Sequence, residues 1–261
     1  EPPVAASAGL PLRFAELTWT ELDRLPRERC LGLLPVGAVE AHGPHLAVST
    51  DRVIAEAMAE AGGRLLARGC WIPLILPTID YVAAPFAAAF PGTLSVAPDT
   101  VRRLIVDLSR SWRAFGGRAM VLANAHLDPA HVGCLRQAQT EAVSKGMGPV
   151  IFPDVTRRPW ALRLTDEFRS GACHAGRYET SIVLARRPDL VRINEAGQLE
   201  DNPRSLSEAI RAGKQSFEEA GGPLAYFGDP AAATAEEGYE TIERLGAILA
   251  DAVLAELGDP E

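Results

Sequence analysis

The five histidines of this sequence lie in three short segments, each of which also contains acidic side chains. These segments are Glu40-Ala-His42-Gly-Pro-His45 followed by Asp51, His126-Leu-Asp128 with His131, and His174 with Glu179. Neutral imidazole nitrogens and carboxylate oxygens form the ligand set of zinc, manganese and iron. Alternate side chains of an extended loop point to the same side, so Glu40 and His42 can share one centre. The pattern therefore predicts a metal centre.

Each of these residues also has an ordinary structural interpretation. A carboxylate at Asp51 or Glu179 can stabilise the start of a helix, by up to about 1 kcal/mol. His45 can support its loop, and His131, within an apolar helix, is more typical of a buried supporting residue than of a ligand. Their joint occurrence favours metal binding, because several carboxylates and imidazoles that converge without a cation would cost several kcal/mol in repulsion and desolvation.

The elements that must position these residues alternate between short apolar segments and longer helical patterns. Strands are predicted at 30–36, 71–79, 119–124 and 150–152, and helices at 51–68, 98–115, 129–145, 179–187 and 234–257. Shorter helices are predicted after the Thr18-x-x-Glu21 capping box and at 205–211. Pro73 and Pro77 place the second strand at a sheet edge or bend it. This alternation is typical of a parallel sheet covered by helices on both faces, and the first two histidine segments directly follow strands, where such sheets bind ligands.

The composition limits the partners and the compartment. The chain has 261 residues, of which 26 are Lys or Arg and 34 are Asp or Glu, so its net charge is -8 and no nucleic-acid partner is expected. No apolar run approaches the roughly 20 residues of a membrane-spanning helix, so we expect a soluble protein with no membrane partner. Four cysteines without a C-x-x-C motif fit a reducing cytoplasm. We expect one domain over 1–261, with residues 1–12 as a flexible lead-in and no secretory signal.

The first histidine segment also carries a family resemblance. LLPVGAVEAHGPHLAVSTD, from Leu33 to Asp51, resembles the signature of the creatininase (creatinine amidohydrolase) family. Later blocks follow in the family's order: FPGTLSV, GGRAMVLANAH, HAGRYETS and GDPAAATAEEG. The resemblance implies a three-layer α/β/α fold with a mainly parallel central sheet. It also implies a homohexamer that holds two divalent metal ions, whether zinc, manganese or iron.

Particular residues take family roles through this resemblance. It implies that Glu40, His42, Asp51 and His126 are metal ligands, with Asp51 bridging the two ions. Either Asp128, two residues after the histidine of its block, or Glu179 completes the second metal site. His174 is implied to handle protons, so His174 and Glu179 are the candidate catalytic residues.

Two departures from the family pattern bear on the substrate. The usual Asn-Gly-His-Gly-Gly-Asn block reads Asn-Ala-His-Leu-Asp-Pro at 124–129, and Arg177 replaces an acid. Arg177 either selects an anionic substrate or points to solvent. We expect a di-metal amidohydrolase that cleaves a non-peptide or cyclic C–N amide bond in a small molecule with an activated water. The alternatives are a peptidase that trims a short modified precursor peptide, of the mycofactocin type, and a non-catalytic metal-binding protein.

Overall fold

The centre of the molecule is a five-stranded sheet in which every strand pair is parallel. The computed structural model describes residues 10–258, and the strand order is β1-β3-β2-β4-β5. The strands are β1 (Leu12–Arg13), β2 (Cys30–Val36), β3 (Ile72–Ile75), β4 (Ala119–Asn124) and β5 (Val150–Ile151). The expected parallel sheet is therefore confirmed.

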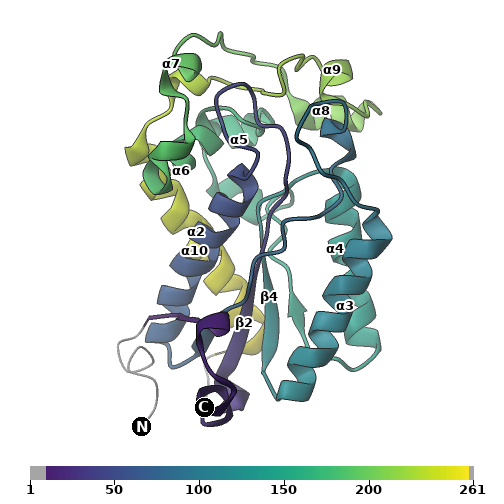
Figure 1. Cartoon of the computed structure of the whole chain (residues 1–261), viewed down its shortest axis with the longest axis vertical. Helices are drawn as coiled ribbons and strands as arrows, with labels where there is room; N and C mark the ends of the chain where they lie inside the picture. The colour runs from purple at the N-terminus through teal and green to yellow at the C-terminus, as the bar shows by residue number, and fades with distance from the viewer. Residues whose placement is uncertain (1–9, 259–261) are drawn as a thin grey trace.

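Helices cover both faces of this sheet, as the three-layer α/β/α prediction requires. Helices α2 and α10 lie on one side and α3 and α4 on the other (Figure 1), while α6 packs against α2 and α10. The long helices are α2 (Thr50–Arg68), α3 (Pro98–Phe115), α4 (Pro129–Ser144), α6 (Arg177–Arg186) and α10 (Ala235–Leu257). The short ones are α1 (Trp19–Asp23), α5 (Asp166–Ser170), α7 (Ile193–Ala196), α8 (Leu206–Arg211) and α9 (Phe217–Ala220).

Strand β2 joins the two hydrophobic layers because successive side chains of a strand point to opposite faces. Leu31 and Leu33 pack into the core shared with α2 and α10. Cys30, Leu34 and Val36 pack into the core shared with α3 and α4. All seven residues of β2 are buried, which explains why this strand is continuously apolar.

Most of the predicted element boundaries are confirmed within a residue or two, because local capping signals set them. Thr18 and Glu21 form the expected capping box, and Gly116 ends α3 in the left-handed conformation. Of the two alternatives for the second strand, an edge place or a bend, the edge place is wrong, since β3 pairs with β1 and β2. Pro73 is tolerated because the amides of β3 alternate in direction, and β1 pairs only with Leu74 and Ile75.

The sequence analysis missed β1 and several short helices above the sheet. Leu12 is buried and pairs with Leu74, so the flexible lead-in does not extend to this residue; residues 1–9 lie outside the described part. Helices α5 and α9, which were not predicted, and α8, which matches the helix predicted at 205–211, lie beyond the carboxyl ends of the strands (Figure 1). Among the described residues, no helix combines the length and apolar character needed to cross a bilayer.

Candidate metal centre

The three histidine segments meet beyond the carboxyl ends of β2 and β4. Ligand atoms lie within 4.8 Å of one another in three buried groups: Glu40 with Asp51 and His126, His42 with Asp51 and Glu179, and Glu40 with His42 and His174. These residues come from the loop after β2, the start of α2, the loop after β4 and the segment around the start of α6. The tertiary structure thus brings six of the seven candidate site residues together.

Asp51 belongs to two of these groups and presents one carboxylate oxygen to each of two histidines. Its Oδ1 lies 3.2 Å from Nε2 of His42, and its Oδ2 lies 3.0 Å from Nδ1 of His126. Asp51 stands in the first turn of α2, which approaches the end of β2 closely at Gly37. A Cβ atom at Gly37 would lie 2.6 Å from the backbone nitrogen of Arg52, so only glycine permits this approach.

Backbone carbonyls orient both of these imidazoles. Nδ1 of His42 donates to the carbonyl of Glu40 at 3.1 Å, and Nε2 of His126 donates to the carbonyl of Ala83 at 2.9 Å. A carbonyl can only accept, so in each neutral ring the other nitrogen carries the lone pair. That nitrogen faces carboxylates: Nε2 of His42 lies 3.5 Å from Glu179, and Nδ1 of His126 lies 3.1 Å from Glu40.

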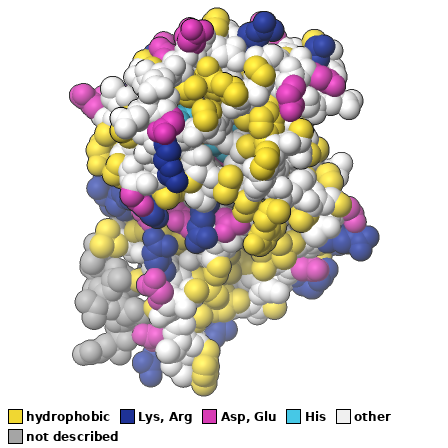
Figure 2. Space-filling view, turned by 45° about the horizontal axis from the view of Figure 1, so that its top comes forward, with side chains coloured by type: hydrophobic (Ala, Val, Ile, Leu, Met, Phe, Trp, Pro, Cys, Tyr) yellow, Lys and Arg dark blue, Asp and Glu magenta, His cyan; other side chains and the backbone are white. Residues whose placement is uncertain are grey.

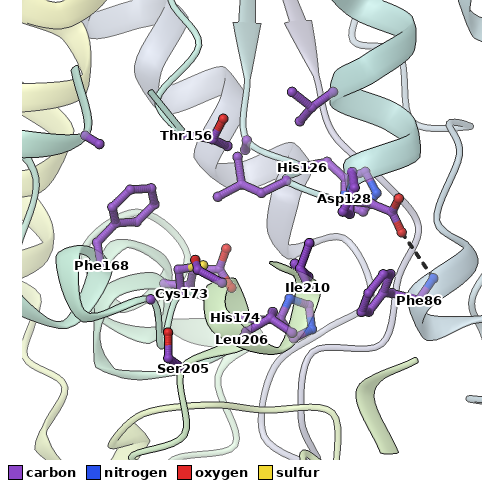
Figure 3. A pocket seen from close by; sticks show the side chains of 18 of the residues that line it. Phe86, His126, Asp128, Thr156, Phe168, Cys173, His174, Ser205, Leu206 and Ile210 are labelled. Atoms are coloured by element: carbon purple, nitrogen blue, oxygen red, sulfur yellow. Dashed lines mark hydrogen bonds between the residues drawn. The ribbon is translucent and has the colours of Figure 1, made fainter. Parts of the chain in front are cut away.

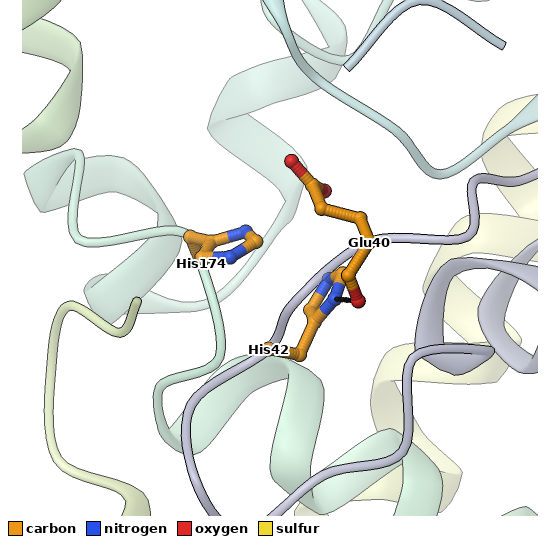
Figure 4. A group of neighbouring side chains, drawn as sticks. All are labelled: Glu40, His42 and His174. Carbon is orange, nitrogen blue, oxygen red and sulfur yellow. Dashed lines mark hydrogen bonds between the residues drawn. The ribbon is translucent and has the colours of Figure 1, made fainter. Parts of the chain in front are cut away.

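The third imidazole, His174, lies beside Glu40 and His42 (Figure 4). Its Nε2 donates to the carbonyl of Ala41 at 3.0 Å, which leaves Nδ1 as the acceptor in the neutral ring. The ring stacks on Phe217 of α9, with 4.2 Å between the ring centroids. Burial lowers the pKa of His174 well below its usual value, and the neighbouring His42 lowers it further. The resting side chain is therefore neutral.

The remaining charges of the cluster depend strongly on one another. Burial lowers the pKa of His42, but Asp51 and Glu179 more than offset this effect and raise it to about 10. Burial also raises the pKa of Asp51, but His42 and His126 hold it well below its usual range. Burial raises the pKa of Glu179 to about 8 despite the nearby His42. Without a cation, the site therefore keeps protons that metal binding must displace.

Glu179 is held toward the centre by a strained backbone. It lies in the first turn of α6, where its Oε2 accepts a hydrogen bond of 2.6 Å from the amide of Ala175. Ala175 has a φ of 51°, in the left-handed region that residues other than glycine rarely adopt. Such strain is typical of functional sites. The helix-start position considered for Glu179 is therefore compatible with a place in the metal centre.

Asp128 lies outside the three groups. Its two carboxylate oxygens accept hydrogen bonds from the amides of Ala130, at 2.8 Å, and Phe86, at 3.1 Å. It therefore caps the start of α4 and anchors the segment around Phe86. Both oxygens of the carboxylate are thus engaged by backbone amides, and neither belongs to the second ligand group.

The other two histidines, His131 and His45, form hydrogen bonds with residues next to the cluster. Nε2 of His131 lies 2.9 Å from Oδ1 of Asn124, whose amide in turn donates to the carbonyl of His126 at 2.7 Å. Nε2 of His45 lies 2.8 Å from the hydroxyl of Thr180. Burial lowers the pKa of His45 to about 4 and that of His131 well below its usual value, so both are neutral. A supporting position was the favoured interpretation for His131 and one possible interpretation for His45.

A pocket of about 530 Å³ opens onto the cluster, and its wall includes Glu40, Asp51, His126, His174 and Glu179. Histidine side chains lie at the bottom of a hollow that hydrophobic side chains border (Figure 2). Phe86, Phe168, Leu206 and Ile210 contribute apolar wall, and Thr156 and Ser205 contribute hydroxyls (Figure 3). The helix predicted at 205–211 is confirmed as α8, but Phe217 and α9, which close this side, were not predicted because their segment has only a polar surface pattern.

Arg177, for which substrate contact was one of two expected roles, and Cys173, which precedes His174, are both poor candidates for chemistry at this site. Arg177 forms ion pairs with Asp166 and Glu237 and is not among the pocket-lining residues, so the suggestion that it selects an anionic substrate is wrong. Cys173 lines the pocket, but burial raises the pKa of its thiol to about 12. It therefore remains a protonated thiol at neutral pH and is a poor nucleophile.

Comparison with known proteins agrees with this architecture. Residues 15–253 match the family Creatininase, described as creatinine amidohydrolase. A mycofactocin precursor peptide peptidase of Mycobacterium tuberculosis (strain CDC 1551 / Oshkosh) is 32% identical over 234 residues, covering 85% of this chain and 84% of that protein. A creatinine amidohydrolase of Pseudomonas putida is 28% identical over 195 residues, covering 69% and 73%. A structure described as "Creatininase Mn" superposes with a TM-score of 0.73 at 26% identity, covering 96% of this chain and 100% of that one. The chain therefore belongs to the creatininase family.

Proposed function

We propose that this protein is a metal-dependent amidohydrolase that holds two divalent cations and cleaves a C–N amide bond with water. One observation carries the proposal: Asp51 presents one oxygen to each of two ligand groups, and both groups include an imidazole that a backbone carbonyl orients. This arrangement suits one bridging carboxylate and two cations. A purely structural cluster has no need to bury three carboxylates together.

The donor set fits zinc, manganese or iron. Glu40 and His126 would hold one cation, His42 and Glu179 the other, and Asp51 both. All five residues are less than 4% exposed, and each has at least one carboxylate or imidazole neighbour in the cluster. We assign Glu179 rather than Asp128 to the second cation, because both oxygens of Asp128 already accept backbone hydrogen bonds.

The residues of the chain would perform the remaining steps of the reaction. Bound divalent cations supply a water of lowered pKa and polarise the amide carbonyl. His174 has Nε2 bonded to Ala41, so its Nδ1 can take a proton from the attacking water. The same nitrogen can then protonate the leaving amine. Phe217, stacked on this ring, holds its orientation and excludes water from that side.

Two substrate classes are candidates. A cyclic or other small amide is the first, because the relative from Pseudomonas putida is named creatinine amidohydrolase. A short peptide is the second candidate, favoured by the name of the Mycobacterium tuberculosis relative and by a volume of about 530 Å³. That volume lies within the range of pockets that hold drug-sized ligands.

Metal analysis combined with turnover tests the proposal. The wild type is expected to hold close to two cations per chain and to release amine from a panel of cyclic amides and acylated peptides. Asp51→Ala is expected to lose both cations together, Glu179→Gln to lose one, and Asp128→Asn, which retains a capping side chain, to lose neither. Full metal occupancy in Asp51→Ala would refute the assignment of Asp51 as the ligand that bridges the two cations. Two cations without turnover on the panel would favour the non-catalytic alternative.

A further inference from the structure

The outer part of the pocket contains arginines that the catalytic proposal does not use. Arg158, Arg169 and Arg211 line the pocket and are exposed to solvent. They come from the loop after β5, from α5 and from the last position of α8, three segments that are separate in the sequence. Within residues 10–258, no carboxylate lies within 4.0 Å of any of the three guanidinium groups.

Other exposed arginines, Arg113 among them, also have no carboxylate partner within residues 10–258, so what sets these three apart is their place around one pocket. The fourth arginine of the pocket, Arg136, is paired with Asp154, and many surface arginines of this acidic chain also pair with carboxylates. The carboxylates that line the pocket are buried in its floor, where the cluster or backbone amides engage them. The pocket therefore has an acidic floor, apolar walls and a basic rim.

The charge of the floor changes when cations bind. Four carboxylates line the floor, from Glu40, Asp51, Asp128 and Glu179, and carry at most four negative charges, which two divalent cations would balance. The loaded pocket would then be neutral or positive at its floor and positive at its rim. Such a field attracts anions and repels cations.

We propose that Arg158, Arg169 and Arg211 form a recognition rim that selects amides bearing an oxyanion, a carboxylate or a phosphate, remote from the scissile bond. This inference rests on the proposed function. Guanidinium groups present planar pairs of donors that match both oxyanions. The apolar walls, including Phe168 and Leu206, would contact the part of the substrate between the oxyanion and the amide.

Calorimetric titration of the metal-loaded protein tests the rim with two matched pairs of ligands. The first pair is a short acetylated peptide that ends in either a carboxylate or a carboxamide. The second is 2-acetamidoethyl phosphate against N-acetylethanolamine. In at least one pair, the charged member is expected to bind about tenfold more tightly than its neutral twin. The pair that shows the preference identifies the oxyanion.

Three variants assign this preference to the rim. In the triple variant in which Arg158, Arg169 and Arg211 are all replaced by Gln, the ratio between charged and neutral twins is expected to fall to about one. Arg113→Gln on α3 is the matched control, because Arg113 is also exposed and does not line the pocket, and it should keep the wild-type ratio. Arg158→Gln alone should reduce the ratio partially.

Two results would overturn the inference: equal binding of the twins in both pairs, or a preference that survives in the triple variant and so comes from the metal centre. Amine release is measured separately in the same samples. Selective binding without turnover on any amide would count against the proposed hydrolysis and leave the rim intact. Turnover without selective binding would support the proposed hydrolysis and count against the arginine rim.

Discussion

Metal binding at this cluster should release protons, and the number follows from the buried groups that share Asp51. With a pKa of about 10, His42 of the empty site is protonated almost completely at pH 7. With a pKa of about 8, Glu179 is about nine-tenths protonated at the same pH. His126 also holds a proton in the empty site, because Glu40 and Asp51 raise its pKa well above the usual value despite burial. We therefore expect two to three protons to leave per chain when both cations bind.

The same protons set how the metal affinity depends on pH. Each displaced proton strengthens the apparent affinity about tenfold per unit of pH, so two cause about a hundredfold change per unit below pH 8. Above pH 8 Glu179 is ionised before the metal arrives, and the slope should fall by one proton. Asp51 contributes nothing to the slope, because its pKa lies well below this range.

Calorimetry in two buffers of different ionisation enthalpy counts the protons, and competition with a chelator between pH 6 and pH 9 measures the slope. Glu179→Gln should lower the count by about one at pH 7, whereas Asp128→Asn should leave it unchanged. Release of less than one proton at pH 7, or an unchanged count in Glu179→Gln, would refute the charge assignment of the cluster.

Stability of the metal-free protein should fall as the pH rises, for the same reason. The raised pKa of His42 contributes stability that is complete below pH 6.5 and is lost as the pH approaches 10. The raised pKa of Glu179 contributes stability that is complete below pH 4.5 and is lost as the pH rises through 8. Melting temperatures of metal-free samples should therefore decrease from pH 6 to pH 9 more steeply than those of loaded samples.

Further predictions concern His174, the start of α2 and the assembly. His174→Ala should keep both cations and lower turnover more for amides with poor leaving groups than for activated amides; loss of a cation would instead make His174 a ligand. Gly37→Ala should lower metal content, because its Cβ would meet the backbone of Arg52 at 2.6 Å and displace the start of α2. Gly133→Ala, which meets nothing within 4 Å, should raise the unfolding free energy by roughly 0.5–1 kcal/mol and leave metal content unchanged. We also propose a hexamer, so light scattering should give about six times 27.9 kDa rather than the mass of one chain.

Local signals in the sequence were sufficient for the main elements and for the composition of the metal centre. The apolar segment of β2, the capping box at Thr18 and the glycine after α3 act within a few residues, so their effects can be read without the fold. Placement of Glu40, His42 and His126 directly after strands indicated one shared edge of a parallel sheet. Family resemblance added the expectation that Asp51 bridges two ions.

Only the tertiary structure decided which partner each of these side chains meets. The 3.5 Å approach of Glu179 to His42, and the bonds that direct Asp128 toward Phe86 and Ala130, depend on how α6 and α4 pack. Likewise, the ion pairs of Arg177 with Asp166 and Glu237 exclude it from contact with an anionic substrate. The arginine rim, in turn, is formed by three segments that are separate in the sequence. These contacts join residues far apart in the chain, so their geometry is set by the packing of whole elements and leaves no periodic or short-range pattern in the sequence.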